Sequence, residues 1–582
     1  MRNPIVPSSI FLSIVVPSFV FFFFNSLSVA APLPPPQEIG SQERARQMQE
    51  EEKKLENEVK AKKKKVKIEE ETLSTEPENP QAMKVLVKKI HVNGVFLFSN
   101  KEIESITNSY INQELTIKKI QEIANRITNL YRKKGYVISR AYIPAHKMAN
   151  GVLEINVIEA KIGDIQIKGN RYHATRLISR DLTIQKGDDF NYKALKKDLD
   201  AMNVRPDRVV KAVLAPGKAS GTSDVLFDVK DAQPFHVQIG YSNSLSRYLR
   251  SNIYDATFID NSLLGQDDVM TFQYARGDNH NYYSYTANYL YPITRSLNMG
   301  IYGGSSKEHM AGEFGDLGAR GKSRSWGAYG SQELYRDDNI DSHFNFGFDY
   351  MDVYNFLNGE VSSRDRLRVG KGGFDFSISD DWGRTLIMDE YDYGIPGIMG
   401  GTPDHPSATD TPTSRSGAGG QFVKDTLNLL RLQVLPLDST LLWKNQFQFS
   451  TSTLTSTEQY QVGGPANNRG YGVSEAVGDE GYSMSWELSE PLYFLSKDVR
   501  VPFSQVRWYD ALRVIEFYDW SNVHLNVVSG SEEKNKTLSS AGCGLKFNVL
   551  RNVSASYEVG WPFQRTSDRK GVHHWFEVRI TY

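Results

Sequence analysis

Arg469 is the residue whose surroundings most strongly indicate a specific chemical role. It lies in the polar, glycine-rich stretch 460–471 and is followed by Gly470 and Tyr471. A guanidinium can hold a carboxylate through two parallel, charge-assisted hydrogen bonds, and a glycine lets the backbone approach another surface closely. A lone arginine in a long loop is more often solvated, so both interpretations stay open on these residues alone.

Sequence motifs for catalysis are scarce. The chain has no Walker loop for nucleotide phosphates, no GxSxG nucleophile elbow and no HExxH zinc motif. His573 and His574 are adjacent, so in a strand their side chains point to opposite faces and cannot easily share a metal ion. Cys543 is the only cysteine, which excludes an internal disulfide. We therefore expect that the protein is not an enzyme and needs no metal or other cofactor.

The composition indicates neither a nucleic-acid-binding protein nor a bundle of membrane-spanning helices. The 582 residues carry a formal net charge of −1, so no global field attracts nucleic acid. Beyond residue 24 no apolar run approaches the roughly 20 residues of a spanning helix. The chain contains 30 Tyr, 29 Phe and 45 Gly, a mixture typical of strands with interfacial aromatic side chains.

Residues 1–30 predict a secretory signal peptide that is removed from the mature chain. Arg2 precedes an almost wholly apolar run at 10–24, and the small residues Ser28 and Ala30 fit a cleavage site. The alternative is an uncleaved membrane anchor, although the run is shorter than the roughly 20 residues that a spanning helix needs.

Residues 31–84 predict a connecting segment. Its start, 31–36, is proline-rich, and 38–71 is a dense run of acidic and basic residues without a continuous apolar face. Such a run is typical of a solvated helix or a disordered tether. The alternative is a polar helix that occupies a polar cavity, such as the lumen of a barrel.

Two successive segments share one order of predicted elements. Residues 85–159 predict strand, helix, helix, strand and strand. Their longer helix carries apolar residues at helical spacing, namely Ile120, Ile123, Ala124, Ile127, Leu130 and Tyr131. Residues 160–232 repeat the order, with Gly169-Asn170 where the first segment has Asn93-Gly94. We interpret them as two copies of one small α+β domain.

From residue 233 to 582 the hydrophobic period changes to two. Aromatic and apolar residues alternate with polar ones in segments that begin at Tyr283, Phe344 and Phe576, so each strand has one apolar face. Aromatic faces, connections of unequal length and the terminal Tyr582 indicate a transmembrane β-barrel, whose closure removes the edges that lipid excludes. At roughly 22 residues per strand and connection, we expect about 16 antiparallel strands, in a range of about 14–18.

A series of short motifs carries a family resemblance. They are Pro216-Gly217 with Gly221-Thr-Ser-Asp224, Asp260-Asn-Ser-Leu-Leu-Gly-Gln-Asp267, Tyr289-Leu-Tyr-Pro-Ile293, Asn468-Arg469-Gly470-Tyr471, Phe517-Tyr518-Asp519, Leu538-Ser-Ser-Ala-Gly-Cys-Gly-Leu545 and Gly560-Trp-Pro-Phe563. In this order, over residues 85–582, they resemble the two-partner secretion transporters of the outer membrane. That haemolysin secretion/activation family is related to the barrel-assembly insertases. The resemblance implies that the two α+β segments are POTRA-like periplasmic domains.

The resemblance also implies a position and a partner for Arg469. In the family the sixth extracellular loop folds into the lumen, and a strand motif of the Phe-Tyr-Asp type follows it; here that motif includes Phe517 and Asp519. We therefore expect Arg469 to clamp Asp519 inside the barrel. Two positions depart from the family pattern: Asn468 replaces a valine before the arginine, and Ser521 replaces a glycine after the strand motif.

The function that this resemblance implies is protein export across the outer membrane of a diderm bacterium. The POTRA-like domains would recognise an unfolded, β-helical, haemolysin- or adhesin-like exoprotein, and the pore, acting as a monomer in the lipid bilayer, would translocate it without ATP. The alternatives are a barrel insertase, whose relatives often carry more POTRA domains, and a passive porin or receptor, which would need neither these domains nor the Arg-Gly-Tyr loop.

Overall fold

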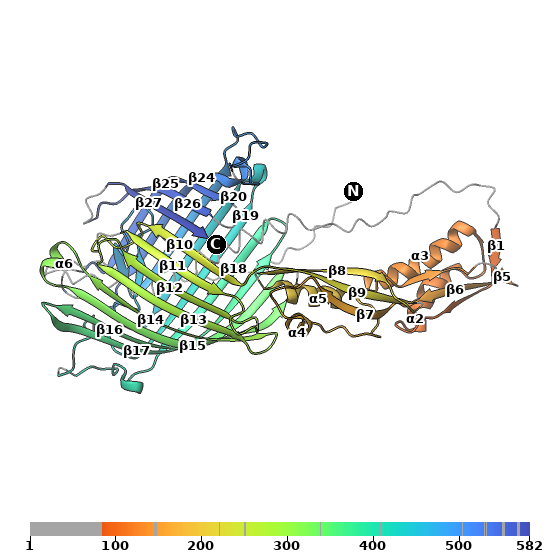
Figure 1. The fold of residues 1–582 in the computed structure, drawn as a ribbon, viewed down its shortest axis with the longest axis horizontal. Helices are drawn as coiled ribbons and strands as arrows, with labels where there is room; N and C mark the ends of the chain where they lie inside the picture. Colours follow the sequence, from red (N-terminus) through yellow and green to blue (C-terminus); the bar gives the residue numbers. More distant parts are fainter. Residues whose placement is uncertain are drawn as a thin grey trace, which may run out of the picture.

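The computed structural model describes residues 84–582, except 145–147, 150, 206, 220, 250–251, 338, 408, 503, 529, 531, 550–552 and 567–570. Two small α+β units form an arm that extends from one end of a closed β-barrel (Figure 1). No helix among the described residues is long and apolar enough to cross a membrane. The predicted signal peptide and the charged segment 38–71 lie outside the described residues.

The first unit packs two helices against a small mixed sheet. Its elements are β1 (Lys84–Val87), β2 (Lys89–Asn93), α2 (Asn100–Thr107), η1 (Asn108–Tyr110), β3 (Gln113–Thr116), α3 (Ile117–Lys133), β4 (Arg140–Tyr142), β5 (Met148–Ala149) and β6 (Val152–Ile158). The strand order is β2-β6-β4, with β5 also pairing with β6. The apolar stripe expected on α3 is buried against Leu153 and Ile155, because these residues recur at helical spacing.

The start of this unit differs from the prediction. A single strand was expected near residues 85–92, but the chain forms β1 and β2. Strand β1 leaves the sheet to pair with β3, which the sequence pattern did not indicate. Pairing between β1 and β3 buries Val87 and Leu115. This burial favours two short strands with a break at Lys88 over one continuous strand.

The second unit has the predicted order of elements. It contains β7 (Lys161–Lys168), α4 (Thr175–Arg180), α5 (Tyr192–Asn203), β8 (Arg208–Pro216) and β9 (Thr222–Asp231), and its strand order is β7-β9-β8. In both units the strand that comes last in the sequence lies at the centre of the sheet. It pairs in parallel with the first strand (β2 with β6, β7 with β9) and antiparallel with the strand on its other side (β4 with β6, β8 with β9). The shared topology supports the interpretation of two copies of one domain.

The two units have glycines at equivalent positions, Gly94 and Gly169, with the same close contact. A Cβ on Gly94 would lie 2.4 Å from the carbonyl oxygen of Val157, and a Cβ on Gly169 would lie 2.4 Å from that of Val229. Both glycines have a positive φ, which side chains with a Cβ rarely adopt. The turn after the first sheet strand therefore needs glycine in both units.

Each turn is also held by a carboxylate at the end of the last strand. Glu159 accepts the backbone N–H groups of Phe96 and Leu97, both at 2.9 Å. Asp231 accepts the corresponding groups of Arg171, Tyr172 and His173. Burial opposes the ionisation of Asp231, but these N–H donors outweigh it and lower its pKa.

The barrel closes with 16 antiparallel strands, as predicted. They are β10 (Phe235–Ser242), β11 (Ile253–Asp260), β12 (Val269–Gly277), β13 (Tyr282–Pro292), β14 (Leu297–His309), β15 (Arg320–Arg336), β16 (Ile340–Leu357), β17 (Glu360–Ser379), β18 (Gly383–Gly394), β19 (Phe422–Val434), β20 (Thr440–Ser450), β23 (Glu480–Pro491), β24 (Leu512–His524), β25 (Asn535–Val549), β26 (Val553–Pro562) and β27 (His573–Thr581). Pairing between β10 and β27 completes the closure, so no barrel edge is left for lipid to meet. Short elements in the connections are α6 (Glu313–Asp316), η2 (Ile398–Gly400), η3 (Pro436–Asp438) and α7 (Trp508–Ala511).

A buried ionic cluster joins the second unit to the barrel. Asp267, in the turn between β11 and β12, lies 3.0 Å from Arg208 at the start of β8. Arg208 also lies 2.9 Å from Asp181, and Arg180 lies 3.2 Å from Asp267. Arg208 and Asp267 are 2% and 1% exposed. We call the end of the barrel at this cluster the arm end, and the opposite end the far end.

Candidate functional site

The loop at 451–479, between β20 and β23, lies inside the barrel. It contains a small hairpin of β21 (Tyr460–Val462) and β22 (Ala476–Gly478). Asn468 and Tyr471 are 0% and 1% exposed. Asn468 donates to the hydroxyl of Ser521 on β24 and to the carbonyl oxygen of Leu538 on β25, and the Tyr471 hydroxyl donates to the carbonyl oxygen of Ser539 on β25. The loop is therefore packed against the inner wall of the barrel rather than extended into water.

The guanidinium of Arg469 uses all five of its N–H donors. Its Nε and Nη2 donate to the two oxygens of Asp519 at 3.0 and 2.9 Å, which is the expected bidentate clamp. Nη1 donates to Glu487 at 2.6 Å and to Glu558 at 3.3 Å. The fifth donor, on Nη2, reaches the hydroxyl of Ser485 at 3.1 Å. Three strands, β23, β24 and β26, thus hold one side chain.

Asp519 also fixes the backbone of the loop. Its Oδ2 accepts the backbone N–H of Arg469 at 2.9 Å, and its Oδ1 accepts the hydroxyl of Ser485 at 2.7 Å. Asp519 is 0% exposed and Arg469 is 4% exposed. A buried carboxylate of this kind depends on its donors, because removal from water penalises its charge.

Aromatic side chains enclose the clamp. The guanidinium carbon of Arg469 lies 3.5 Å from the ring centroid of Phe517, a cation–π contact. Trp575, on β27, donates its indole N–H to the carbonyl oxygen of Arg469 at 2.7 Å. Phe517, expected from its motif, is therefore a direct neighbour of the charge, and Trp575 was not anticipated.

Gly470 and Tyr471 hold the loop against β25. A Cβ on Gly470 would lie 2.3 Å from Cβ of Ser540, so only glycine permits this approach to the wall. The backbone N–H of Gly470 donates to the Ser540 hydroxyl at 3.1 Å. The Tyr471 hydroxyl accepts the backbone N–H of Gln564 and lies 2.7 Å from its Oε1.

The two departures from the family pattern contact each other. The amide nitrogen of Asn468 donates to the hydroxyl of Ser521 at 3.3 Å and to the carbonyl oxygen of Leu538 at 3.2 Å. Its amide oxygen accepts the Ser540 hydroxyl at 2.7 Å. A polar side chain in the loop is therefore matched by polar groups on the wall, so the two departures compensate each other.

A second buried ion pair ties another loop to the base of this one. Arg415, in the connection 395–421, lies 2.6 Å from Asp479. Asp479 also accepts the backbone N–H groups of Leu454 and Asn526 at 2.9 and 2.8 Å. Three connections at the far end are therefore joined at one carboxylate. Arg415 was not predicted from the sequence, because nothing in its local pattern indicates a partner 64 residues away.

The arrangement is suited to holding a loop in place. Its charged groups are paired with one another, and Lys546 also pairs with Glu487. Within the part of the chain that the structure describes, no group of three or more His, Cys, Asp or Glu residues is arranged to hold a metal ion. The site is therefore a buried polar lock between a loop and the barrel wall.

Two family models match the chain. Residues 85–160 match the model described as POTRA domain, ShlB-type, and residues 221–507 match the model described as haemolysin secretion/activation protein ShlB/FhaC/HecB. Together they cover most of the first unit, the end of the second and more than half of the barrel strands.

Curated proteins resemble the chain over most of its length. The heme/hemopexin transporter protein HuxB of Haemophilus influenzae (strain 86-028NP) is 22% identical over 83% of this chain and 84% of its own. The outer membrane transporter CdiB of Escherichia coli O6:K15:H31 (strain 536 / UPEC) is 22% identical over 84% and 82%. The hemolysin transporter protein ShlB of Serratia marcescens is 24% identical over 71% and 73%.

Solved structures share the fold. CdiB from Escherichia coli matches with a TM-score of 0.71 and 20% identity, over 95% of this chain and all of that one. CdiB from Acinetobacter baumannii matches with a TM-score of 0.60 and 15% identity, over 94% and all of that chain. The complete arrangement of arm and barrel is therefore shared.

Proposed function

Because this chain belongs to the two-partner secretion transporters of the outer membrane, we propose that it recognises an unfolded exoprotein in the periplasm and moves it to the cell surface without ATP. The chain is an outer-membrane barrel that serves the secretion of a cognate partner, and its POTRA domains are periplasmic. The arm end of the barrel therefore faces the periplasm, and the far end faces the cell surface.

The observation that carries this proposal is an arm fixed at the mouth of a barrel whose lumen holds a locked loop. The ionic cluster at Arg208 and Asp267 sets the second unit against the periplasmic rim. A client bound there starts beside the pore entrance. The loop of Arg469 lies in the path that the client would follow, so its position controls the space available for transport.

The second unit offers an edge strand for recognition. β8 pairs with β9 on one side and is the outer strand of the sheet β7-β9-β8. Val209 and Val213 on β8 are 53% and 49% exposed. An unfolded segment with β-helical propensity can add to such an edge through main-chain hydrogen bonds, while its side chains pack on exposed apolar neighbours. This mode suits a client that arrives without tertiary structure.

Transport in this proposal uses the free energy of client folding rather than nucleotide hydrolysis. The chain has no Walker loop or other nucleotide motif. A β-helical exoprotein that folds as it emerges cannot return through the pore, so folding outside biases the motion outward. The pore acts as a monomer in this scheme, because each barrel has its own arm and lumen.

A photo-crosslinking experiment tests the recognition step. A photoreactive residue at position 213, on the edge strand, is expected to crosslink to the exoprotein during export. The same residue at position 204, where Val204 is 53% exposed beyond the end of α5, is the matched control and should give little product. Equal crosslinking at both positions, or none at position 213 in exporting cells, would exclude strand addition at β8.

A further inference from the structure

Six basic side chains share the outer face of β15 and β17 at the cell-surface end of the barrel. We call this set the basic face: Arg320, Lys322, Arg324, Arg364, Arg366 and Arg368. β16 lies between the two strands. The register pairs Asp352 of β16 with Arg324 on one side and Arg366 on the other. Residues paired in this way point to the same side of a sheet.

The direction of this face follows from the residues farther along the same strands. Trp326 on β15, Phe346 on β16 and Phe374 on β17 have even residue numbers, like the members of the basic face, so they lie on the same side of these strands. They are 45%, 37% and 41% exposed. Their neighbours of opposite parity, such as Asp349 and Lys371, pair with each other in the lumen. The basic side chains therefore point away from the lumen, toward the membrane and its surface.

The basic face begins where the apolar belt of the barrel ends. From Ile340 to Tyr350 the outward residues of β16 are mainly apolar or aromatic, over about the 9–11 residues that a spanning strand needs. At the upper limit Tyr350 stacks on Trp326, with ring centroids 5.1 Å apart. Aromatic girdles of this kind mark the boundary between lipid and water. Arg368 lies over the Tyr350 ring at 3.3 Å, so the cations start at the depth of the lipid headgroups.

Little negative charge opposes these cations. Asp352 pairs with Arg368 at 3.0 Å and with Arg364 at 3.4 Å. Among the described residues, no carboxylate lies within ion-pair distance of the other four members of the basic face, namely Arg320, Lys322, Arg324 and Arg366. Uncompensated arginines beside an apolar belt indicate an anionic ligand from outside the chain.

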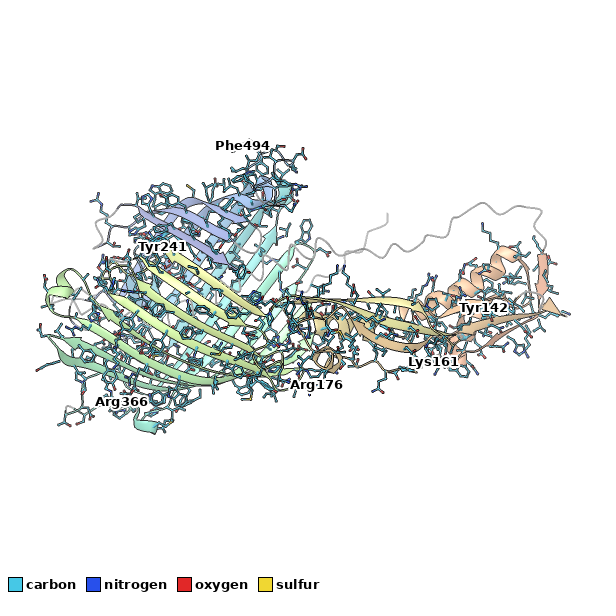
Figure 2. All side chains as sticks on the ribbon, viewed as in Figure 1. Tyr142, Lys161, Arg176, Tyr241, Arg366 and Phe494 are labelled. Carbon is cyan, nitrogen blue, oxygen red and sulfur yellow. The ribbon has the colours of Figure 1, made fainter. Side chains whose placement is uncertain are left out.

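A polar cleft adjoins two of the arginines. Arg364 and Arg366 form one wall, and the connection between β18 and β19 forms the other with Thr402, Thr409 and Thr411 and one carboxylate, Asp410; the volume is about 250 Å³. Guanidinium forks and hydroxyl groups match the oxygens of a phosphate. Figure 2 shows Arg366 on the barrel at the end away from the arm.

We propose that the basic face binds the phosphate groups of an anionic glycolipid in the outer leaflet of the outer membrane. The acyl chains lie along the aromatic and apolar belt below Trp326, and the phosphates sit among the five cations other than Arg368, one of them at the cleft of Arg364 and Arg366. Arg368 is 1% exposed and donates to the carbonyl oxygens of Met351, Leu367 and Met399, so it forms the lower edge of the site and does not contact the phosphates. The bound lipid anchors β15–β17 and the adjoining surface connection. This site is separate from the lumenal lock and does not depend on the export mechanism.

Native mass spectrometry of the purified full chain in detergent tests the site with diphosphoryl lipid A as the probe. The variant Arg320→Gln/Arg324→Gln/Arg366→Gln removes three cations outside the Asp352 ion pairs. Near an anionic surface each cation strengthens binding about fivefold, so binding should weaken on the order of 100-fold. The control Lys101→Gln/Lys119→Gln/Lys133→Gln makes the same change in charge on the first periplasmic unit and should keep the wild-type affinity.

Three results would overturn the proposal. They are equal binding by the basic-face variant and the wild type, equal binding of dephosphorylated lipid A, and displacement of the lipid by an equimolar amount of inorganic phosphate, which would indicate a site for free anions. Heat-modifiable gel mobility reports whether the variant folds. If it does not, Arg324→Gln alone, at an exposed position, should weaken binding about fivefold, and unchanged binding would contradict the site.

Discussion

Replacing Arg469 with alanine is expected to lower export of the exoprotein by at least about tenfold, while the barrel still reaches the outer membrane. The change leaves Asp519, Glu487 and Glu558 without their shared cation in a buried site. Removing one partner of a buried ion pair costs about 3–5 kcal/mol, compared with about 0–1 kcal/mol for an exposed pair. The loop 451–479 should then detach from the inner wall of the barrel, and it should no longer hold a fixed position in the lumen.

Two further substitutions separate the clamp from a general effect of charge. Arg469→Lys should restore little export, because an ammonium lacks the planar fork that spans Asp519 and has fewer donors. Arg500→Ala, at an exposed position between β23 and β24, should export like the wild type. The measurement is the exoprotein in the culture medium, normalised to the amount of folded barrel.

The partner substitution tests the pairing itself. Asp519→Ala should give the same kind of defect, and the double variant Arg469→Ala/Asp519→Ala should be little worse than either single change. Additive defects, or full export by Arg469→Ala, would show that the clamp has no role in transport.

The junction between arm and barrel carries the second large expected effect. Arg208→Ala should release the second unit from the rim, because Asp267 and Asp181 both lose a buried partner. The expected loss is about 3–5 kcal/mol of docking free energy. The distribution of distances between spin labels on β9 and on the β11–β12 turn should broaden from one population to several, and export should fall.

An exposed ion pair in the same unit is the control for this junction. Lys161 and Asp189 lie 3.7 Å apart on the exposed surface of the second unit, so Lys161→Ala should change stability by about 0–1 kcal/mol and leave the label distances unchanged. A narrow wild-type distance distribution in Arg208→Ala would show that other contacts, such as Asp207 with His236 and Asn261, suffice to fix the arm.

Much of the architecture could be predicted because its signals are local and periodic. The apolar spacing on α3 predicted the longest helix of the arm, and alternation at Phe344 and Phe576 predicted barrel strands. The number of strands came from the length of the region, at roughly 22 residues per strand and connection. The two strands β1 and β3 were missed as a pair, because each has four residues and their pairing depends on a contact across α2.

The site was predictable only in part. The motif around Arg469 and its resemblance indicated Asp519, and the structure brings these two residues together. Glu487, Glu558 and Trp575 belong to separate strands, and only the register and curvature of the closed barrel bring them to one guanidinium. The alternation along β23 and β26 shows which residues point into the barrel. It marks every second residue, however, and therefore does not single out Glu487 and Glu558.

Transport of the cognate exoprotein into proteoliposomes that contain only this chain is the most direct test of the central claim. The exoprotein is added unfolded on the side of the arm, without nucleotide, and its protection from an external protease is followed over time. We expect protected, folded exoprotein to accumulate with the wild type and to fall at least about tenfold with Arg469→Ala. No accumulation with the wild type, or accumulation only when ATP is added, would contradict the account.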